Sequence, residues 1–320
     1  MSGALIVSLD FELYWGMQDV CPLSGYRENV LGGRAAIPRL LSLFRAHGIH
    51  ATWAVVGLMM ARDASDARRH LPAVPPTYRN PARNACRLLD GGLPDREPDC
   101  FFADGLIARV AAEPGMELAS HTFSHYYCRE PGQTVDQFRA DMAAAAAIAR
   151  EHGYALTSAV LPRNECEAPY IAALSELGFT AFRGEEDDWI HRRVKPRPLM
   201  RLLRLADVYL PLTGYRGFVP RREHGVWNLA GTRMFKPIFP PLRPLEGLKL
   251  RRIKRHMRHA AVHGGICHLW WHPHNLGVRT QAHFDQLEEI FSYYETLRDR
   301  FGMESLNMRE AAEAESQKEP

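Results

Sequence analysis

The chain has 320 residues, of which 46% are hydrophobic and 24% are charged, so it is expected to bury a large core rather than to remain disordered. Its formal net charge of +3 is too small to indicate a nucleic-acid-binding protein by itself. The six cysteines form no C-x-x-C pair, which argues against a disulfide framework and against a cysteine-based zinc site.

The first predicted element is a short strand over residues 4–9, a brief aliphatic run that is typical of a strand buried on both faces. Asp10 and Glu12 follow at its C-terminal end. Because side chains alternate along a strand, these two carboxylates are expected to face the same way and converge. Like charges that close repel one another unless a positive group lies beside them, and a divalent metal ion is the obvious candidate.

Helical and strand patterns then alternate along the chain with short connections, which is typical of parallel α/β architecture. The predicted helices cover residues 35–45, 102–112, 135–152, 169–177 and 282–300, with a small helix near the C-terminus. The predicted strands cover residues 50–56, 116–119, 158–161, 179–182 and 265–271, with a short one near Ser305.

Two segments interrupt this alternation. Residues 61–100 and 184–262 contain many prolines and arginines and show little periodicity, so we expect both to be insertions over the active-site face, the first as a lid. We therefore expect a single catalytic domain over residues 1–312, followed by a disordered polar tail over residues 313–320.

A histidine pair follows the predicted strand 116–119. His121 and His125 are spaced i and i+4, which places them on one face of a helical turn, with Ser120 as a candidate cap. At that spacing they could hold a single metal ion. Two histidines and a carboxylate that leave one position open form a standard catalytic zinc arrangement, in which the bound water becomes a nucleophile near neutral pH.

Two further polar clusters also follow predicted strands. Arg163 and Asn164 come directly after strand 158–161, and His272 and His274 come after strand 265–271. Loops at the C-terminal ends of parallel strands share one face of a barrel. The clusters are therefore predicted to meet in one site.

Each candidate also has a purely structural interpretation. The two acids could be helix caps or surface salt-bridge partners, and Arg163 could cover apolar neighbours at the surface. His272 and His274 could be packing or solvent residues. His268 lies on the order of 13 Å from His272 along an extended strand, so a core position is expected for it.

With these motifs in hand, the chain resembles the polysaccharide deacetylase family, carbohydrate esterase family 4, over nearly its whole length. That family carries an acidic first motif, an H-[ST]-x-x-H second motif, an arginine-led third motif, a tryptophan-containing fourth motif and a histidine in a fifth. The corresponding residues here are 8–12, 121–125, Arg163 with Pro169 and Tyr170, the acidic run before Trp189, and His272.

The first motif departs from the family's usual adjacent aspartates, because Phe11 separates Asp10 from Glu12. It looks more like the family branch with a D-x-[DE] motif, which implies Asp10 as the base and Glu12 as a metal ligand. The third motif is spread out along the chain, which leaves the role of Tyr170 open.

The fourth motif departs as well. Asp188 directly precedes Trp189, whereas Glu185 occupies the spacing of the family's aspartate. The fold that the resemblance implies is a distorted parallel β/α barrel, which agrees with the alternation of predicted strands and helices.

The resemblance implies a metal-dependent hydrolase that removes an N-acyl group, acetyl in the leading interpretation, from an amino sugar. The implied ligands of one divalent metal ion, zinc or else cobalt, nickel, manganese or iron, are Glu12, His121 and His125. Asp10 is the implied base, kept ionised by the opposite charge of Arg163.

The remaining roles concern the substrate. His272 is the implied acid that protonates the leaving amine, with His274 as the alternative. Trp189 and Trp271 would form apolar walls against the acyl or sugar group, although core positions are an equal alternative. Asn164 and His274 are the other expected substrate contacts.

No basic leader or small-residue cleavage site precedes the first strand, so we expect a cytoplasmic protein that acts on a nucleotide sugar or a lipid-linked precursor in surface polysaccharide biosynthesis. Basic residues in 192–197 and 249–255 suit a diphosphate or the anionic inner face of a membrane. Between them, residues 199–210 mix leucines with arginines, as an interfacial helix does. A solvated basic face is an equal alternative.

Two other functions stay open at this point. A deformylase that acts on a formamido sugar would use the same metal centre with a tighter acyl pocket. A carbohydrate-binding protein without turnover would lack a base or a metal ligand, and none is missing from the sequence.

Overall fold

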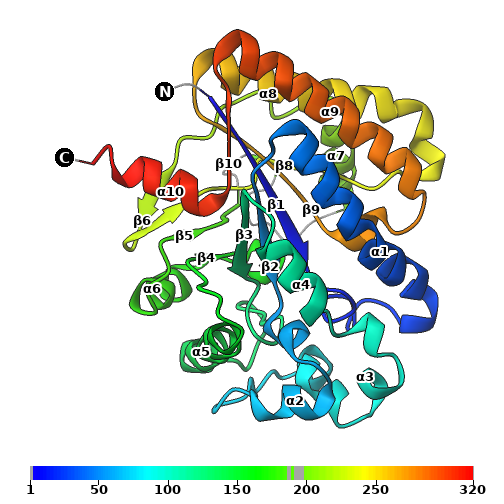
Figure 1. Cartoon of the computed structure of the whole chain (residues 1–320), viewed down its shortest axis with the longest axis vertical. Coiled ribbons are helices and arrows are strands. Elements are labelled where there is room, and N and C mark those ends of the chain that lie inside the picture. The colour runs from blue at the N-terminus through cyan, green and yellow to red at the C-terminus, as the bar shows by residue number, and fades with distance from the viewer. Residues whose placement is uncertain (1–2, 186–188, 191–197, 320) are drawn as a thin grey trace.

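The structure is a computed structural model that describes residues 3–185, 189–190 and 198–319 (Figure 1). Within these residues, ten strands form one sheet in the order β6-β7-β5-β4-β3-β2-β1-β9-β8, and β10 pairs with β1. All neighbouring strands are parallel except β6 and β7. The strands are β1 (Ala4–Phe11), β2 (Ala51–Val55), β3 (Met116–Ser120), β4 (Ser158–Ala159), β5 (Ala181–Phe182), β6 (Arg221–Glu223), β7 (Val226–Asn228), β8 (Arg233–Met234), β9 (Ile266–Trp271) and β10 (Glu304–Leu306). The predicted parallel α/β architecture is confirmed.

Helices cover this sheet, with α1, α8 and α9 along one side in Figure 1 and α5 and α6 packed together on another. The helices are α1 (Leu23–His47), α2 (Ala64–Arg69), α3 (Leu93–Arg96), α4 (Asp104–Ala111), α5 (Val135–Glu151), α6 (Ala168–Glu176), α7 (Pro198–Tyr209), α8 (Glu246–His263), α9 (Thr280–Phe301) and α10 (Met308–Ser316). Helix α10 extends into residues 313–316, which were predicted to belong to a disordered tail. None of the described helices is long and apolar enough to cross a membrane.

Residues 226–234 contain β7, near one end of the strand order, and β8, at the other end. Strand β7 pairs with β5, and the backbone N–H of Gly231 donates to the carbonyl oxygen of Gly184 at 3.0 Å. From Thr232 onward the same segment pairs with β9 instead, beginning with a 3.0 Å hydrogen bond from the Thr232 N–H to the carbonyl oxygen of His268. The sheet is therefore curled into a distorted barrel, as predicted.

This segment lies within residues 184–262, which the sequence predicts to be an insertion. That prediction is wrong for β7 and β8, which belong to the sheet, and for α8, which packs against α9 and β9. The two strands contain three and two residues, too few to show a strand periodicity. They are defined by their pairing partners and not by a local pattern.

The other predicted insertion, residues 61–100, folds into α2, α3 and short 3-10 turns. Figure 1 shows α2 and α3 at the end of the molecule toward which β1 and β3 point. The insertion contacts the loop after β1, where the backbone N–H of Tyr14 donates to the carbonyl oxygen of Cys100 at 3.1 Å. It therefore borders the carboxyl ends of the strands, where the candidate site lies.

Helix α1 begins at Leu23, well before the helix predicted over residues 35–45. Gly32 and Gly33 lie inside it, and because glycine disfavours helix, they hide these turns from a sequence-based prediction. A Cβ atom on Gly33 would lie 2.4 Å from the Cα atom of His274. The glycines therefore let the histidine loop after β9 pack directly against α1.

We predict that Gly33→Ala lowers the free energy of unfolding by about 1–3 kcal/mol, because the added methyl group displaces the backbone at His274. Denaturant-induced unfolding measures this change. Gly25→Ala in the same helix is the matched control, since a Cβ atom there meets nothing within 4 Å. The control should be neutral or stabilising by up to about 1 kcal/mol, and equal losses in the two variants would contradict the role of Gly33.

Candidate metal centre and active site

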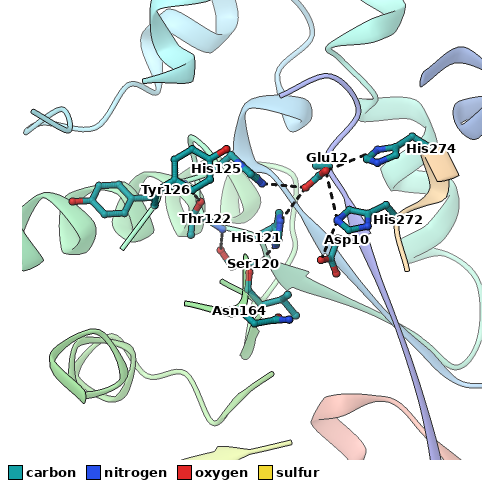
Figure 2. A network of polar contacts seen from close by, with 12 residues as sticks. Asp10, Glu12, Ser120, His121, Thr122, His125, Tyr126, Asn164, His272 and His274 are labelled. Carbon is teal, nitrogen blue, oxygen red and sulfur yellow. Dashed lines mark hydrogen bonds and ion pairs between the residues drawn. The ribbon is translucent and has the colours of Figure 1, made fainter. Parts of the chain in front are cut away.

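Glu12, His121 and His125 converge at the carboxyl ends of β1 and β3 (Figure 2). One ligand-type atom from each residue lies within 4.8 Å of the other two, and all three side chains are buried. The Nε2 atoms of His121 and His125 lie 3.2 and 3.1 Å from Oε2 of Glu12. The structure thus brings the first acidic motif and the histidine pair together, while their role as metal ligands stays a prediction.

The histidine pair does not lie on a helical turn, contrary to its spacing-based prediction. Residues 121–125 form an irregular loop in which Thr122 and His125 have φ angles of 63° and 57°. Such left-handed backbone is uncommon for non-glycine residues and interrupts a regular helix. The Ser120 hydroxyl accepts the Thr122 N–H at 3.1 Å, and the buried carboxylate of Asp141 accepts two further loop N–H groups. These contacts fix the loop so that both rings face one carboxylate.

This donor set fits a divalent metal ion. The Nδ1–H of His121 donates to the carbonyl oxygen of Val160 at 2.7 Å, which leaves the Nε2 lone pair facing Glu12. Burial lowers the pKa of His125, so its ring stays in the neutral form that binds metals. Burial alone would raise the pKa of Glu12, but the neighbouring histidines hold that pKa well below its usual value. Two imidazoles and one carboxylate also leave coordination positions for water and substrate.

Asp10, the second acid of β1, forms a buried ion pair with Arg183. The guanidinium Nη1 and Nη2 atoms lie 2.6 and 2.7 Å from Oδ1 and Oδ2 of Asp10. Arg183 is held in turn by Asn164, whose Oδ1 accepts its Nε–H at 3.0 Å, and by the ring of Trp270, 4.3 Å from the guanidinium carbon. Burial alone would raise the pKa of Asp10, but the charges of Arg183, His272 and His121 and the hydrogen bond from Arg183 together outweigh burial, and the pKa is lowered.

The sequence predicts Arg163 as the partner of Asp10, and that pairing is wrong. Arg163 adopts a φ angle of 58° in a 3-10 turn, and its guanidinium binds Glu130 at 2.9 Å and Asp19 at 3.2 Å. Its side chain is 39% exposed, as expected under the alternative of a surface arginine. The functional residue that sequence reasoning missed is Arg183, which also follows a predicted strand and could have been found by the same criterion.

His272 reaches both acids. Its Nε2 atom lies 3.6 Å from Oδ2 of Asp10 and 3.7 Å from Oε1 of Glu12, and its side chain is 21% exposed. His274 stacks on it with 4.9 Å between ring centroids but is itself buried. Burial and the charge of His272 lower the pKa of His274 to about 3, so that ring is neutral near pH 7. His268 is fully buried, which confirms the core position predicted for it.

The tryptophans are arranged differently from the expectation. Trp271 is fully buried among aromatic core side chains, so its core alternative is the correct one. Its neighbour Trp270 instead covers the ion pair at Asp10. Trp189 is 52% exposed. Asp188, assigned to the fourth motif, and the basic residues 192–197 lie outside the described residues.

Comparison with known proteins supports the family resemblance that the sequence motifs indicate. The family model of polysaccharide deacetylase matches residues 24–182. A protein of Mycobacterium smegmatis that carries the name polysaccharide deacetylase has a TM-score of 0.62 and 16% identity, covering 99% of this chain and 92% of that one. One of the same name from Pseudomonas aeruginosa PAO1 has a TM-score of 0.59 and 14% identity, covering 99% and 91%.

A GH57-type branching enzyme from Pyrococcus horikoshii shares the fold more distantly, with a TM-score of 0.53 and 10% identity over 97% of this chain and 69% of that one. No curated protein matches the sequence. The family match begins after residues 10–12, so the assignment to a D-x-[DE] branch stays a prediction.

We predict that Arg183→Gln lowers the free energy of unfolding at neutral pH by about 3–5 kcal/mol, because it leaves the Asp10 carboxylate buried without a cation. Arg163→Gln, which removes a half-exposed arginine, should cost no more than about 1 kcal/mol. Denaturant-induced unfolding as a function of pH measures the free energy of unfolding of both variants.

The wild-type pKa of Asp10 is depressed, so its ionised form stabilises the fold above the pKa of the unfolded chain, and this contribution is lost as pH falls through the native pKa. The difference in the free energy of unfolding between wild type and Arg183→Gln should therefore become smaller in acid. A difference that is small at neutral pH, or that grows in acid, would contradict the ion pair.

Proposed function

Because the chain belongs to the polysaccharide deacetylase family, we propose that it is a metal-dependent amide hydrolase that removes an acetyl group from an N-acetylated amino sugar. The observation that carries this proposal is the buried cluster of Glu12, His121 and His125 beside the ion pair of Asp10 and Arg183. Family membership alone would leave turnover open, whereas this cluster contains both a ligand set and a charged base.

Glu12, His121 and His125 would hold one divalent ion, zinc or else cobalt, nickel, manganese or iron, which lowers the pKa of a water molecule and polarises the acyl carbonyl. Asp10 would serve as the base that accepts a proton from the attacking water. Its carboxylate is ionised and held in one orientation by the two-point contact with Arg183, so it is positioned before substrate arrives.

His272 returns the proton to the leaving amine. Its Nε2 atom lies 3.6 Å from Oδ2 of Asp10, so a proton taken up by Asp10 has a short path to the imidazole. His272 is also more exposed than His274, which gives it access to the substrate. These positions support His272 as the acid, with His274 packed behind it.

We predict that His121→Ala and Glu12→Ala lose stoichiometric metal, because each removes one of three ligands, whereas Asp10→Asn keeps the metal and loses turnover by about 10²–10⁴-fold. Elemental analysis of purified protein measures the metal, and acetate and formate release from N-acylated amino sugars measures turnover. The acid released distinguishes an acetyl from a formyl substrate.

His263→Ala, at an exposed position in the last turn of α8, is the matched control and should change neither the metal content nor the turnover. Wild-type protein without stoichiometric divalent metal, or full metal retention in both ligand variants, would refute the metal centre. Turnover in Asp10→Asn equal to that of wild type would refute the assigned base.

The proposal includes a cytoplasmic substrate and peripheral contact with an anionic membrane surface. Helix α7 supports this contact, because Leu199 and Leu202 are 64% and 61% exposed and Arg201 lies between them in sequence. Exposed leucines interspersed with arginines are typical of helices that lie in a membrane interface.

We predict that the protein co-sediments with vesicles containing anionic lipid more strongly than with neutral vesicles, and that Leu199→Ser with Leu202→Ser weakens this binding several-fold. Leu177→Ser, which changes an exposed leucine at the end of α6, is the control and should have no effect. Equal sedimentation with both kinds of vesicle would exclude the membrane contact.

A further inference from the structure

A cavity of about 1230 Å³ adjoins the candidate site, between α7, α8, the loops after β4 and β5, and residues of β8 and β9. Asn164 and Trp270 line it, and both contact Arg183, so one wall of the cavity is continuous with the ion pair at Asp10. Ligand pockets for small molecules are typically about 300–1,000 Å³. A single amino sugar would therefore leave much of this space unfilled.

Most cations of the cavity wall already have anionic partners. The buried Arg252 donates to Asp207 at 2.7 Å, and the buried Lys249 lies 2.5 Å from Glu246. Both belong to the basic run 249–255, which the sequence suggested for diphosphate binding. Because these two side chains are committed to internal ion pairs, that interpretation does not hold for them.

Three cations of the cavity wall have no anionic partner: within the part of the chain that the structure describes, Arg201, Arg204 and Lys236 line the cavity and form no ion pair. Arg129 and Arg163 also line the cavity, but both bind glutamates. Arg201 and Arg204 lie one turn apart on α7, and Lys236 follows β8.

The environment of Lys236 and Arg204 indicates uncompensated positive charge. Arg204 is anchored by its Nε–H, which donates to the carbonyl oxygen of Ile190 at 3.1 Å, so its two Nη groups stay available. The side chain of Lys236 is exposed to solvent on the wall of the cavity. Desolvation by the cavity wall, and then the charge of Arg204, lower the pKa of Lys236. An anion between the two groups would relieve this repulsion.

We infer that Arg204 and Lys236, with Arg201 beside them, bind a phosphate ester carried by the substrate. A guanidinium matches two phosphate oxygens at once, and an ammonium adds a point charge, which together suit a phosphate or diphosphate group. The inference rests on the proposed function for the sugar, which would extend past Trp270 toward Asp10. The phosphate site itself does not require turnover.

The test is titration calorimetry of the full chain with inorganic pyrophosphate. Arg204→Gln and Lys236→Gln should each weaken binding about tenfold or more, because each removes a charge-assisted contact to the anion. Arg251→Gln and Lys254→Gln are matched controls, since they remove the same charges from α8 outside the cavity wall. Both controls should bind pyrophosphate as wild type does.

Two results of the titration would overturn the inference. One is wild-type protein that does not bind pyrophosphate. The other is equal affinity in the cavity variants and their controls, which would assign any binding to general surface charge. Circular dichroism of each variant shows that it is folded, so a loss of binding is not a loss of structure.

Parallel assays separate this inference from the proposed function. If a neutral N-acetylglucosamine oligomer is deacetylated equally by wild type and the cavity variants, and pyrophosphate binding is also equal, the phosphate site is wrong and the hydrolase stands. If no substrate is hydrolysed but pyrophosphate binding is lost in Arg204→Gln and Lys236→Gln, the phosphate site stands and the hydrolase is wrong.

The source of the phosphate is resolved by two substrates. A higher kcat/KM for UDP-N-acetylglucosamine than for the neutral oligomer, lost in Lys236→Gln, supports the site with a nucleotide sugar as substrate. The same preference for a polyprenyl-diphosphate-linked N-acetylglucosamine in detergent micelles supports it with a lipid-linked substrate. No preference for either phosphorylated compound over the neutral oligomer would count against the inference.

Discussion

Two carboxylates buried at the end of one strand constrain the rest of the structure. Asp10 and Glu12 are each 3% exposed, and a buried carboxylate is costly unless it has its own cation or hydrogen-bond donors. Asp10 is neutralised by Arg183, which follows β5, and Glu12 faces the two histidines of the loop after β3. His272, after β9, borders both acids. Each partner follows a different strand. The parallel sheet must therefore bring four strand ends together to offset the free-energy cost of burying the two carboxylates.

The fold by itself does not determine the reaction. The Pyrococcus horikoshii protein that shares it at 10% identity carries the name of a branching enzyme and not that of a deacetylase. In the present chain the features on which a function can be argued are local: an irregular loop that turns two imidazoles onto one carboxylate, and a guanidinium paired with the neighbouring carboxylate. Both depend on backbone geometry that a fold comparison does not describe.

The sequence was sufficient for the alternation of strands and helices and for the position of the long strands. A strand buried on both faces leaves a continuous aliphatic run, as residues 4–9 do, although β1 extends two residues beyond that run and ends at Phe11. It was not sufficient to choose between Arg163 and Arg183, because both follow short strands and only the backbone direction decides which one reaches Asp10. It also missed the strands in residues 226–234, which exist only through pairing with distant segments. The early turns of α1 were hidden by glycines whose role is close packing.

The pairing of β1 has a consequence for biosynthesis. One edge of β1 is covered by β2 along residues 7–11 and by β10 along residues 4–6, whereas the other edge is covered by β9, with Ala4 opposite Ile266. A ribosome makes the chain from its N-terminus, so the edge of β1 that pairs with β9 has no native partner until β9 has been synthesised. Unpaired strand edges invite association with other chains, and contacts this distant in sequence slow folding. Asp10 and Glu12 are thus synthesised before Arg183 and His272, and the surroundings of the two acids are complete only after β9 has been made.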